Sequence, residues 1–217
     1  YITQSINGKS HAQLAEEACL AGVNWIQLRV KNKPCSEWKE IALETLAVCR
    51  KYNAKLIIND SMTLTKDIGA NGVHLGKNDL STAEARRVLG KEFIIGGSAN
   101  TFDDIKRHAD ARVDYIGLGP FRFTSTKEKL NPILGLEGYN RIMEQCKEAA
   151  IDIPIIAIGG ILPDDIPQIR EIGLHGVAVS GAISHAQNKS EVVSHFRSAL
   201  SASPVFVNKP TTKSNKK

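Results

Sequence analysis

Short apolar segments alternate with segments of helical periodicity along almost the whole chain, and this alternation restricts the fold more than any other feature. The predicted strands are residues 1–3, 25–29, 56–59, 72–75, 93–98, 115–119, 155–158 and 176–180. Between them, apolar residues recur three and four positions apart, which predicts helices. The clearest of these are residues 12–21, 38–52, 82–89 and 136–149. Regular βα repetition produces either a doubly wound sheet or a closed barrel.

The strands themselves are apolar at successive positions, as in AKLII and IPIIAI. This is typical of strands buried on both faces, as in parallel sheets. Eight βα units without a long interruption favour the barrel, for which the chain is near the minimum length. No Pro-rich or Ser-rich linker divides the units. We therefore predict an α/β fold with a single (β/α)8 TIM-barrel domain over residues 1–202, followed by a basic, disordered tail over residues 203–217.

The charge distribution argues against a nucleic-acid partner. The formal net charge is +5, but four lysines lie in the tail, which has no acidic residue, so the rest of the chain carries +1. No apolar run reaches the ~18 residues of a membrane span, and no basic and apolar leader precedes the first helix. We expect small-molecule partners and a cytoplasmic location, with homo-oligomer formation left open.

The four cysteines do not form a metal-binding or disulfide pattern. Cys19, Cys35, Cys49 and Cys146 have no CxxC spacing and do not cluster with histidines. Metal and disulfide chemistry would require tighter pairing. We interpret all four as reduced thiols of the core.

Polar residues gather where the predicted strands end, and in a βα barrel these ends converge on the active site. Arg29 and Lys31 leave the second strand at alternate positions, so both can face the barrel mouth. Lys127, after the sixth strand, adds a third cation. Three convergent cations suit a polyanion such as pyrophosphate. The alternative for Arg29 is an ion pair between strands inside the barrel.

Two aspartates follow neighbouring strands and are expected to lie close together. Asp60 ends the third strand and Asp79 follows the fourth. Two carboxylates beside an anion site are what Mg²⁺ requires to bridge protein and phosphate. The alternative for each is a helix N-cap, because a helical segment starts just after it. Asn59 could donate a hydrogen bond to a ligand.

A second anion site is expected after the seventh and eighth strands, where barrels of this type frequently bind phosphate. Paired glycines let backbone N–H groups approach a ligand, although tight turns use glycine as well. A hydroxyl-rich loop between the two anion sites adds donors, and His74 is a candidate for lining the pocket. The other five histidines are expected at the solvent-exposed surface. The residues of this second site are Thr124, Ser125, Thr126, Gly159, Gly160, Ser180 and Gly181.

These stretches together resemble the thiamine phosphate synthase family. The matching motifs are WIQLRVKNK, LIIND, GANGVHLGKNDLS, IIGGSA, DYIGLGPFRFTSTK, IPIIAIGGI and GVAVSGAI, in the order of that family. The resemblance implies a (β/α)8 barrel that joins 4-amino-2-methyl-5-(diphosphooxymethyl)pyrimidine to 4-methyl-5-(2-phosphoethyl)thiazole, or its carboxylated form. The implied products are thiamine phosphate and pyrophosphate, formed by a dissociative, Mg²⁺-assisted reaction.

The resemblance also implies a role for each site residue. The pyrimidine diphosphate ligands would be Gln27, Arg29, Lys31, Asn59, Ser98 and Lys127, and among them Arg29, Lys31 and Lys127 would be catalytic. The thiazole phosphate ligands would be Thr124, Ser125, Thr126, Gly160, Ser180 and Gly181. Asp60 and Asp79 would hold Mg²⁺.

Two positions depart from the pattern of the family. Ser180 comes before Gly181 rather than one residue later, which would displace a hydroxyl contact to phosphate but not a backbone contact. Lys77 stands where glutamine is common and is expected to add a cation near the mouth. Two alternatives to the synthase are a thiazole tautomerase on the same barrel and a non-catalytic protein that binds thiamine precursors. Retention of the acidic and basic residues argues against the tautomerase, which has no pyrophosphate to expel.

Overall fold

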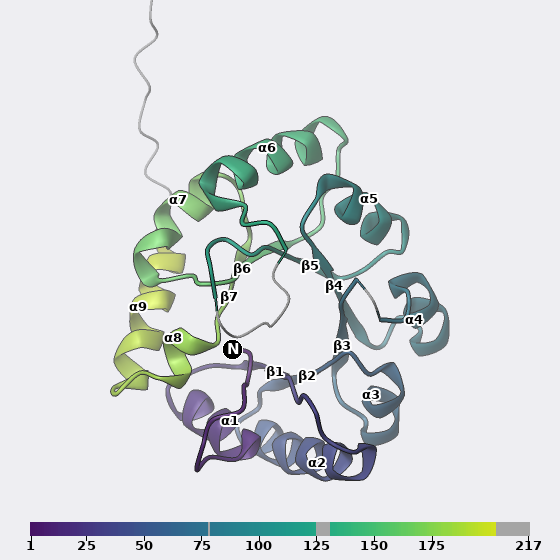
Figure 1. The fold of residues 1–217 in the computed structure, drawn as a ribbon, viewed down its shortest axis with the longest axis vertical. Helices are drawn as coiled ribbons and strands as arrows, with labels where there is room; N and C mark the ends of the chain where they lie inside the picture. The colour runs from purple at the N-terminus through teal and green to yellow at the C-terminus, as the bar shows by residue number, and fades with distance from the viewer. Residues whose placement is uncertain (78, 125–130, 203–217) are drawn as a thin grey trace, which may run out of the picture.

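The computed structural model describes residues 1–77, 79–124 and 131–202, and their fold is built on seven parallel strands that follow one another in chain order in one curled sheet (Figure 1). Each strand is parallel to its neighbours, and the pairing register runs from Ile26 opposite Leu56 in β1 and β2 to Ala157 opposite Val177 in β6 and β7. The strands are β1 (Trp25–Leu28), β2 (Lys55–Asn59), β3 (Gly72–Leu75), β4 (Ile94–Ala99), β5 (Tyr115–Leu118), β6 (Ile155–Ile158) and β7 (Gly176–Ala178).

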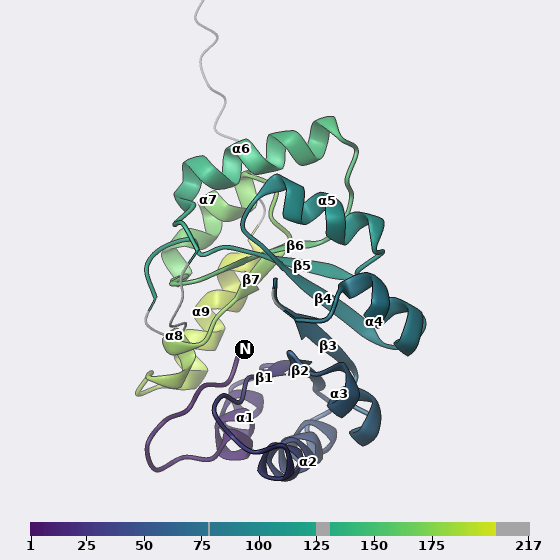
Figure 2. The same cartoon turned by 45° about the vertical axis from the view of Figure 1, so that its right-hand side comes forward.

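Helices surround the curled sheet on its outer side (Figures 1 and 2). The helices are α1 (His11–Leu20), α2 (Cys35–Lys51), α3 (Met62–Ile68), α4 (Thr82–Leu89), α5 (Phe102–Asp110), α6 (Gly135–Glu148), the 3₁₀ helix η1 (Pro163–Asp165), α7 (Ile166–Glu171), α8 (Gly181–Ser184) and α9 (Lys189–Ser201). Helix α9 contacts both α7 and α1, so the last helix lies beside the first.

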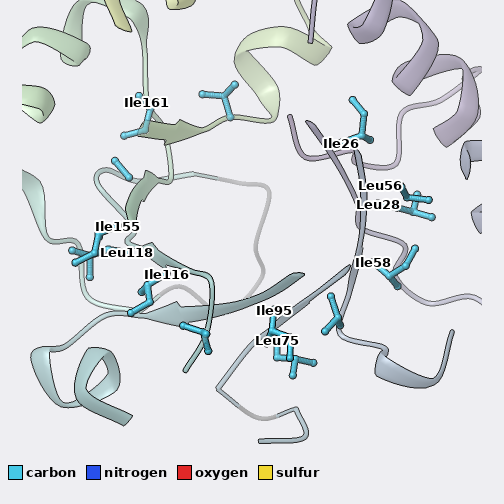
Figure 3. Close-up of a cluster of buried hydrophobic side chains, with 14 of the residues drawn as sticks. Ile26, Leu28, Leu56, Ile58, Leu75, Ile95, Ile116, Leu118, Ile155 and Ile161 are labelled. Atoms are coloured by element: carbon cyan, nitrogen blue, oxygen red, sulfur yellow. The ribbon is translucent and has the colours of Figure 1, made fainter. Parts of the chain in front are cut away.

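The apolar core lies between the sheet and this ring of helices. Side chains alternate between the two faces of a strand, and buried aliphatic residues occupy outward positions in β1 to β6 (Figure 3). Examples are Ile26 and Leu28 in β1, and Ile116 and Leu118 in β5. The intervening positions face the interior of the curl, where polar residues such as Gln27 and Asn59 occur beside aliphatic residues such as Ile57. The polar site residues therefore interrupt the apolar runs only at inward positions.

The predicted strand over residues 1–3 is not a strand in the structure. Ile2 forms an isolated parallel bridge to Gln27. Its backbone N–H also donates to the carbonyl of Val179, beyond the end of β7, at 2.9 Å. On the other side, Gln27 N–H donates to the Tyr1 carbonyl at 2.8 Å, and Thr3 N–H donates to the Gln27 carbonyl at 2.9 Å. This short segment therefore hydrogen-bonds to both edges of the seven-stranded sheet.

Serine side chains begin the two helices that follow β2 and β3. Ser61 Oγ accepts from the backbone N–H of Leu64, and Ser81 Oγ accepts from that of Glu84. Each bond satisfies one of the free N–H groups of the first helical turn. The preceding aspartates, Asp60 and Asp79, are therefore not the N-caps of these helices.

The cysteines are free, and three of the four belong to the core. Cys19, Cys49 and Cys146 are buried. Cys35 is exposed at the start of α2, so its prediction as a core thiol is wrong. None of the helices in the described ranges is long and apolar enough to cross a membrane.

Candidate active site

A cavity of about 510 Å³ opens at the carboxyl ends of the strands. Arg29 lines it from just after β1, and Ser98 lines it from β4. The N-terminal segment at Ile2 and Gln4, the ends of β5, β6 and β7 and the loops after them supply the rest of its wall. This volume falls within the ~300–1,000 Å³ of typical small-molecule sites. Seven predicted site residues line this cavity: Arg29, Ser98, Thr124, Gly159, Gly160, Ser180 and Gly181.

The far end of the cavity combines glycines with a buried hydroxyl group. Gly159 and Gly160 have positive φ angles of +95° and +68°, a backbone conformation that favours glycine. Ser180 Oγ is buried and has no hydrogen-bond partner in the described part of the chain. Buried polar groups are nearly always hydrogen-bonded. A ligand oxygen bound between Gly160 and Gly181 would supply the missing partner.

Arg122 also lines the cavity and was not predicted from the sequence. Its guanidinium donates two hydrogen bonds to the Asp165 carboxylate, at 2.8 Å and 2.7 Å, and one to the Gly160 carbonyl at 2.7 Å. It also lies 4.8 Å from the centre of the Phe121 ring. A bidentate pair of this kind holds the guanidinium in one orientation and also neutralises its charge. Arg122 therefore joins the loop after β5 to the loop after β6.

The predicted acidic pair forms at the ends of β2 and β3. The Asp60 and Asp79 side chains lie close enough for each carboxyl group to affect the pKa of the pair. Burial raises the pKa of Asp79, and the nearby Asp60 side chain and its charge raise it further. Lys31 Nζ forms an ion pair with Asp60 Oδ2, and the backbone N–H of Gly76 donates to Asp79 Oδ2 at 2.6 Å. Two carboxylates are thus held together beside one cation.

The backbone at Asp60 has an unusual conformation. Its φ is +69°, in the left-handed region that residues with a side chain rarely adopt. Its N–H donates to the carbonyl of His74 in the next strand at 2.8 Å. Strained conformations of this kind cluster at functional sites. The strain is consistent with a role for Asp60 other than helix capping.

Lys77 does not add a free cation to the mouth, contrary to expectation. Its Nζ is 3.0 Å from Asp104 Oδ1, and Asp104 is only 2% exposed. Asp104 also accepts from the backbone N–H groups of Asn100 and Thr101 and pairs with Arg107. Lys77 thus ties the loop of the acidic pair to the start of α5.

Asp104→Asn should destabilise the protein near neutral pH and have much less effect near pH 3. Burial alone would raise the pKa of Asp104, but the hydrogen bonds from Asn100 and Lys77 outweigh burial and lower it. A carboxyl with a lowered pKa stabilises the fold above its unfolded pKa of ~3.9, and the effect is lost as the pH falls through the folded value. Urea denaturation of both proteins at pH 7 and pH 3 measures this. Equal destabilisation at the two pH values would contradict it.

The remaining predicted residues lie in three places. Gln27 and Asn59 are buried in β1 and β2. Lys31, Asp60 and Asp79 do not line the cavity. Ser125, Thr126 and Lys127 lie outside the described residues. Arg29 takes part in no ion pair within the described residues, so the predicted alternative, an ion pair between strands, is not observed there.

Two of the five histidines that were expected at the surface, His11 and His108, are buried, each only 8% exposed, whereas His185 is exposed as expected. His185 lines the cavity and hydrogen-bonds to Gln4, whose Nε2 is 2.9 Å from the ring Nε2. His74, a candidate for lining the pocket, is buried behind Ser98, at 2.9 Å from its hydroxyl.

A curled parallel sheet with its cavity at the carboxyl ends of the strands is the architecture of α/β enzymes that build their active sites from βα loops. The family model described as thiamine monophosphate synthase matches residues 1–183. The chain belongs to this family of transferases.

Individual relatives agree with this family. The chain is 52% identical over 188 residues to a protein of Phocaeicola vulgatus named thiamine-phosphate synthase, covering 87% of this chain and 90% of that protein. It is 45% identical over 205 residues to a protein of the same name from Flavobacterium johnsoniae, covering 94% and 97%. Among solved structures, thiamine phosphate pyrophosphorylase from Pyrococcus furiosus matches with a TM-score of 0.78 at 28% identity, covering 92% of this chain and 94% of that chain.

Proposed function

We propose that the chain condenses 4-amino-2-methyl-5-(diphosphooxymethyl)pyrimidine with 4-methyl-5-(2-phosphoethyl)thiazole, or its carboxylated form, to give thiamine phosphate and pyrophosphate. The observation that carries this proposal is one cavity lined both by a cation that has no ion-pair partner in the described residues and by a buried hydroxyl that has no hydrogen-bond partner there. Arg29 supplies the cation, and Ser180 supplies the hydroxyl. Two anionic substrates could bind there with their reacting centres adjacent.

The first substrate would bind on the Arg29 side of the cavity and extend past its wall toward Lys31 and Asn59, which do not line it. Arg29, Lys31 and Lys127 would neutralise its diphosphate, and Gln27, Asn59 and Ser98 would contact the rest of the molecule. Gln27, Asn59 and Ser98 lie on β1, β2 and β4 and come from alternating inward positions. Residues on rigid strands hold a ligand more closely than residues on loops.

The thiazole phosphate would bind at the other end, where Gly160, Ser180 and Gly181 line the cavity with Thr124. Ser125 and Thr126 complete this proposed set. Backbone N–H groups and hydroxyls can hold a phosphate without a cation. The displaced order of Ser180 and Gly181 is compatible with this, because the Ser180 hydroxyl is buried and has no partner in the described ranges.

Asp60 and Asp79 fit a magnesium site. Within the described ranges, no group of three or more His, Cys, Asp or Glu residues gathers as a metal site. Mg²⁺ is commonly bound by one or two carboxylates, with waters and substrate phosphates as the other ligands. The mutual contact that raises the pKa of Asp79 would be relieved by a divalent cation. When bound, the ion would supply positive charge for the departing pyrophosphate.

The proposed reaction needs no protein nucleophile. The bond between the methylene carbon and the diphosphate oxygen breaks first, and its electron pair leaves with pyrophosphate. The thiazole nitrogen then donates its lone pair to the pyrimidine methylene cation. Arg29, Lys31 and Lys127 would stabilise the charge that builds on the leaving group, and the two ends of the cavity would hold the reactants in line.

Incubation of the purified protein with both substrates and Mg²⁺ tests this function. We expect thiamine phosphate and pyrophosphate in equal amounts, with no product when either substrate is left out. Conversion of the thiazole phosphate alone into an isomer would identify a tautomerase. Binding of the substrates without any turnover would identify a non-catalytic protein, and either outcome would refute the proposal.

Lys127→Ala should lower the rate of thiamine phosphate formation about tenfold or more, because it removes one of the three proposed leaving-group cations. Its melting temperature should stay close to that of the parent protein. Steady-state kinetics and thermal unfolding measure both effects. Lys129→Ala, in the same loop sequence, is the matched control and should retain activity. A Lys127 variant that unfolds would indicate a structural role instead.

We also infer that the domain is a complete (β/α)8 barrel over residues 1–202. The hydrogen bonds of Tyr1, Ile2 and Thr3 to Gln27 and Val179 support this, because they join both edges of the sheet. In this interpretation the segment 1–3 occupies the position of the eighth strand of the barrel, although it is too short to be a regular strand.

A further inference from the structure

A chain of three hydrogen-bonding side chains crosses the interior of the sheet and ends at the cavity. His74 lies on β3, Ser98 on β4 and Tyr115 on β5. The Nδ1 of His74 is 3.0 Å from the Tyr115 hydroxyl, and its Nε2 is 2.9 Å from Ser98 Oγ. Ser98 lines the cavity, and His74 is buried behind it. Each imidazole nitrogen thus has a hydroxyl group within hydrogen-bonding distance.

The neighbouring glycines provide the space for these two rings. A Cβ at Gly96 would lie 2.2 Å from Cζ of Tyr115, and a Cβ at Gly117 would lie 3.3 Å from Cε1 of His74. Larger residues at Gly96 would displace the tyrosine ring. The Trp25 ring also packs against the tyrosine, with the two ring centres 5.7 Å apart and the ring planes nearly perpendicular. The network is therefore built into three adjacent strands.

The chemistry of the three groups determines which of them donates and which accepts each hydrogen bond. A neutral imidazole donates from one nitrogen and accepts at the other. The phenol is a stronger acid than the serine hydroxyl, so Tyr115 is the better donor to Nδ1. Burial raises the pKa of Tyr115, so it keeps its proton. Nε2 then carries the imidazole hydrogen and donates it to Ser98 Oγ.

We propose that His74, held in this tautomer by Tyr115, is a positioning residue that makes the Ser98 hydroxyl a hydrogen-bond donor toward the anionic substrate in the cavity. With its oxygen occupied by the Nε2 hydrogen, Ser98 directs its own hydrogen away from His74. The identity of that substrate, the pyrimidine diphosphate, rests on the proposed function. The tautomer of His74 does not.

A double-mutant cycle tests whether Tyr115 acts through Ser98. Tyr115→Phe should raise the KM for 4-amino-2-methyl-5-(diphosphooxymethyl)pyrimidine about tenfold, the effect of one lost hydrogen bond to a charged group. The KM for the thiazole phosphate should stay within twofold. In a Ser98→Ala background, Tyr115→Phe should change neither KM further. Additive effects in the double variant, or equal increases in both KM values, would overturn the proposal.

Tyr139→Phe is the matched control. It removes another tyrosine hydroxyl, one that donates to the Leu118 carbonyl of β5 at 2.9 Å. It should lower stability but leave both KM values unchanged.

If Tyr115→Phe does not fold, His74→Gln and His74→Leu replace it. Glutamine keeps an N–H near the position of Nε2 and should retain the KM within threefold, whereas leucine should raise it about tenfold. Equal KM values for these two variants would refute the proposal.

¹⁵N NMR of the histidine ring gives a readout independent of turnover. We expect His74 to carry its hydrogen on Nε2 in the parent protein and to lose this preference in Tyr115→Phe. A hydrogen on Nδ1 in the parent protein would overturn the proposal. A protein that forms no thiamine phosphate but keeps the Nε2 tautomer would refute the proposed function and leave the orientation of Ser98 supported.

Discussion

Asp60→Asn and Asp79→Asn should each lower kcat/KM at limiting Mg²⁺ by at least about tenfold, because each variant replaces a charged ligand of the proposed metal site with a neutral amide. Asp60→Asn also removes the ion-pair partner of Lys31. Asp79→Asn removes one carboxylate of a pair in mutual contact. Higher Mg²⁺ should restore part of the rate in both variants.

Folding stability separates this effect from damage to the structure. Burial and the neighbouring Asp60 raise the pKa of Asp79, so the folded protein disfavours its ionised form. The neutral Asp79→Asn side chain should therefore leave the melting temperature in metal-free buffer unchanged or raised. Asp67→Asn, an exposed position on α3, makes the same charge change and should retain full activity. Undiminished turnover of either site variant at limiting Mg²⁺ would contradict the metal assignment.

Gly160→Ala should raise the KM for the thiazole phosphate at least about tenfold. The added Cβ would lie 2.3 Å from Cγ of Arg122 and 3.0 Å from the carbonyl oxygen of Phe123. Arg122 would have to move, although it is bonded to both Asp165 and the Gly160 carbonyl. The wall of the cavity would shift with it, and a misplacement of ~1 Å can cost about a hundredfold in rate.

Gly173→Ala is the control for backbone strain. Gly173 has a φ of +99°, and a Cβ there meets only Cε of Met143, at 3.7 Å. Gly173→Ala should lose about 1–2 kcal/mol of unfolding free energy from the left-handed conformation, and Gly160→Ala should lose at least as much, measured by urea denaturation. Only Gly160→Ala should also raise the KM. An equal KM in the two variants would show that the cavity tolerates a displaced Arg122.

Local sequence patterns predicted most of the sheet. Each of the seven strands β1–β7 overlaps a predicted segment, because runs of outward aliphatic residues mark buried strands without knowledge of their partners. The prediction failed for residues 1–3, because only Ile2 pairs with a neighbouring strand and one bridge does not make a regular strand. The proximity of Asp60 and Asp79 was predictable too, because parallel strands bring their carboxyl ends to one edge.

Side-chain partnerships were less accessible to sequence reasoning. Arg122 lies within the motif GPFRFTSTK, but its partner Asp165 is 43 residues away and has no distinctive spacing. Lys77 was expected to face the mouth, and its pairing with Asp104 depends on how α5 is placed. The link from Tyr115 to Ser98 through His74 spans three strands. Such contacts follow from the register of the sheet rather than from local periodicity.

At the starts of α3 and α4, helix capping and the proposed metal binding are carried out by different residues, the serines and the nearby aspartates. Ser61 and Ser81 satisfy the helix ends, so exchanging the neighbouring acidic residues leaves helix initiation intact. A protein engineer could therefore vary Asp60 and Asp79 to alter ion preference without removing either helix cap, within the limit that the positive φ of Asp60 sets on the residues allowed there. The residues that would bind the metal ion can thus change independently of the residues that begin the helices.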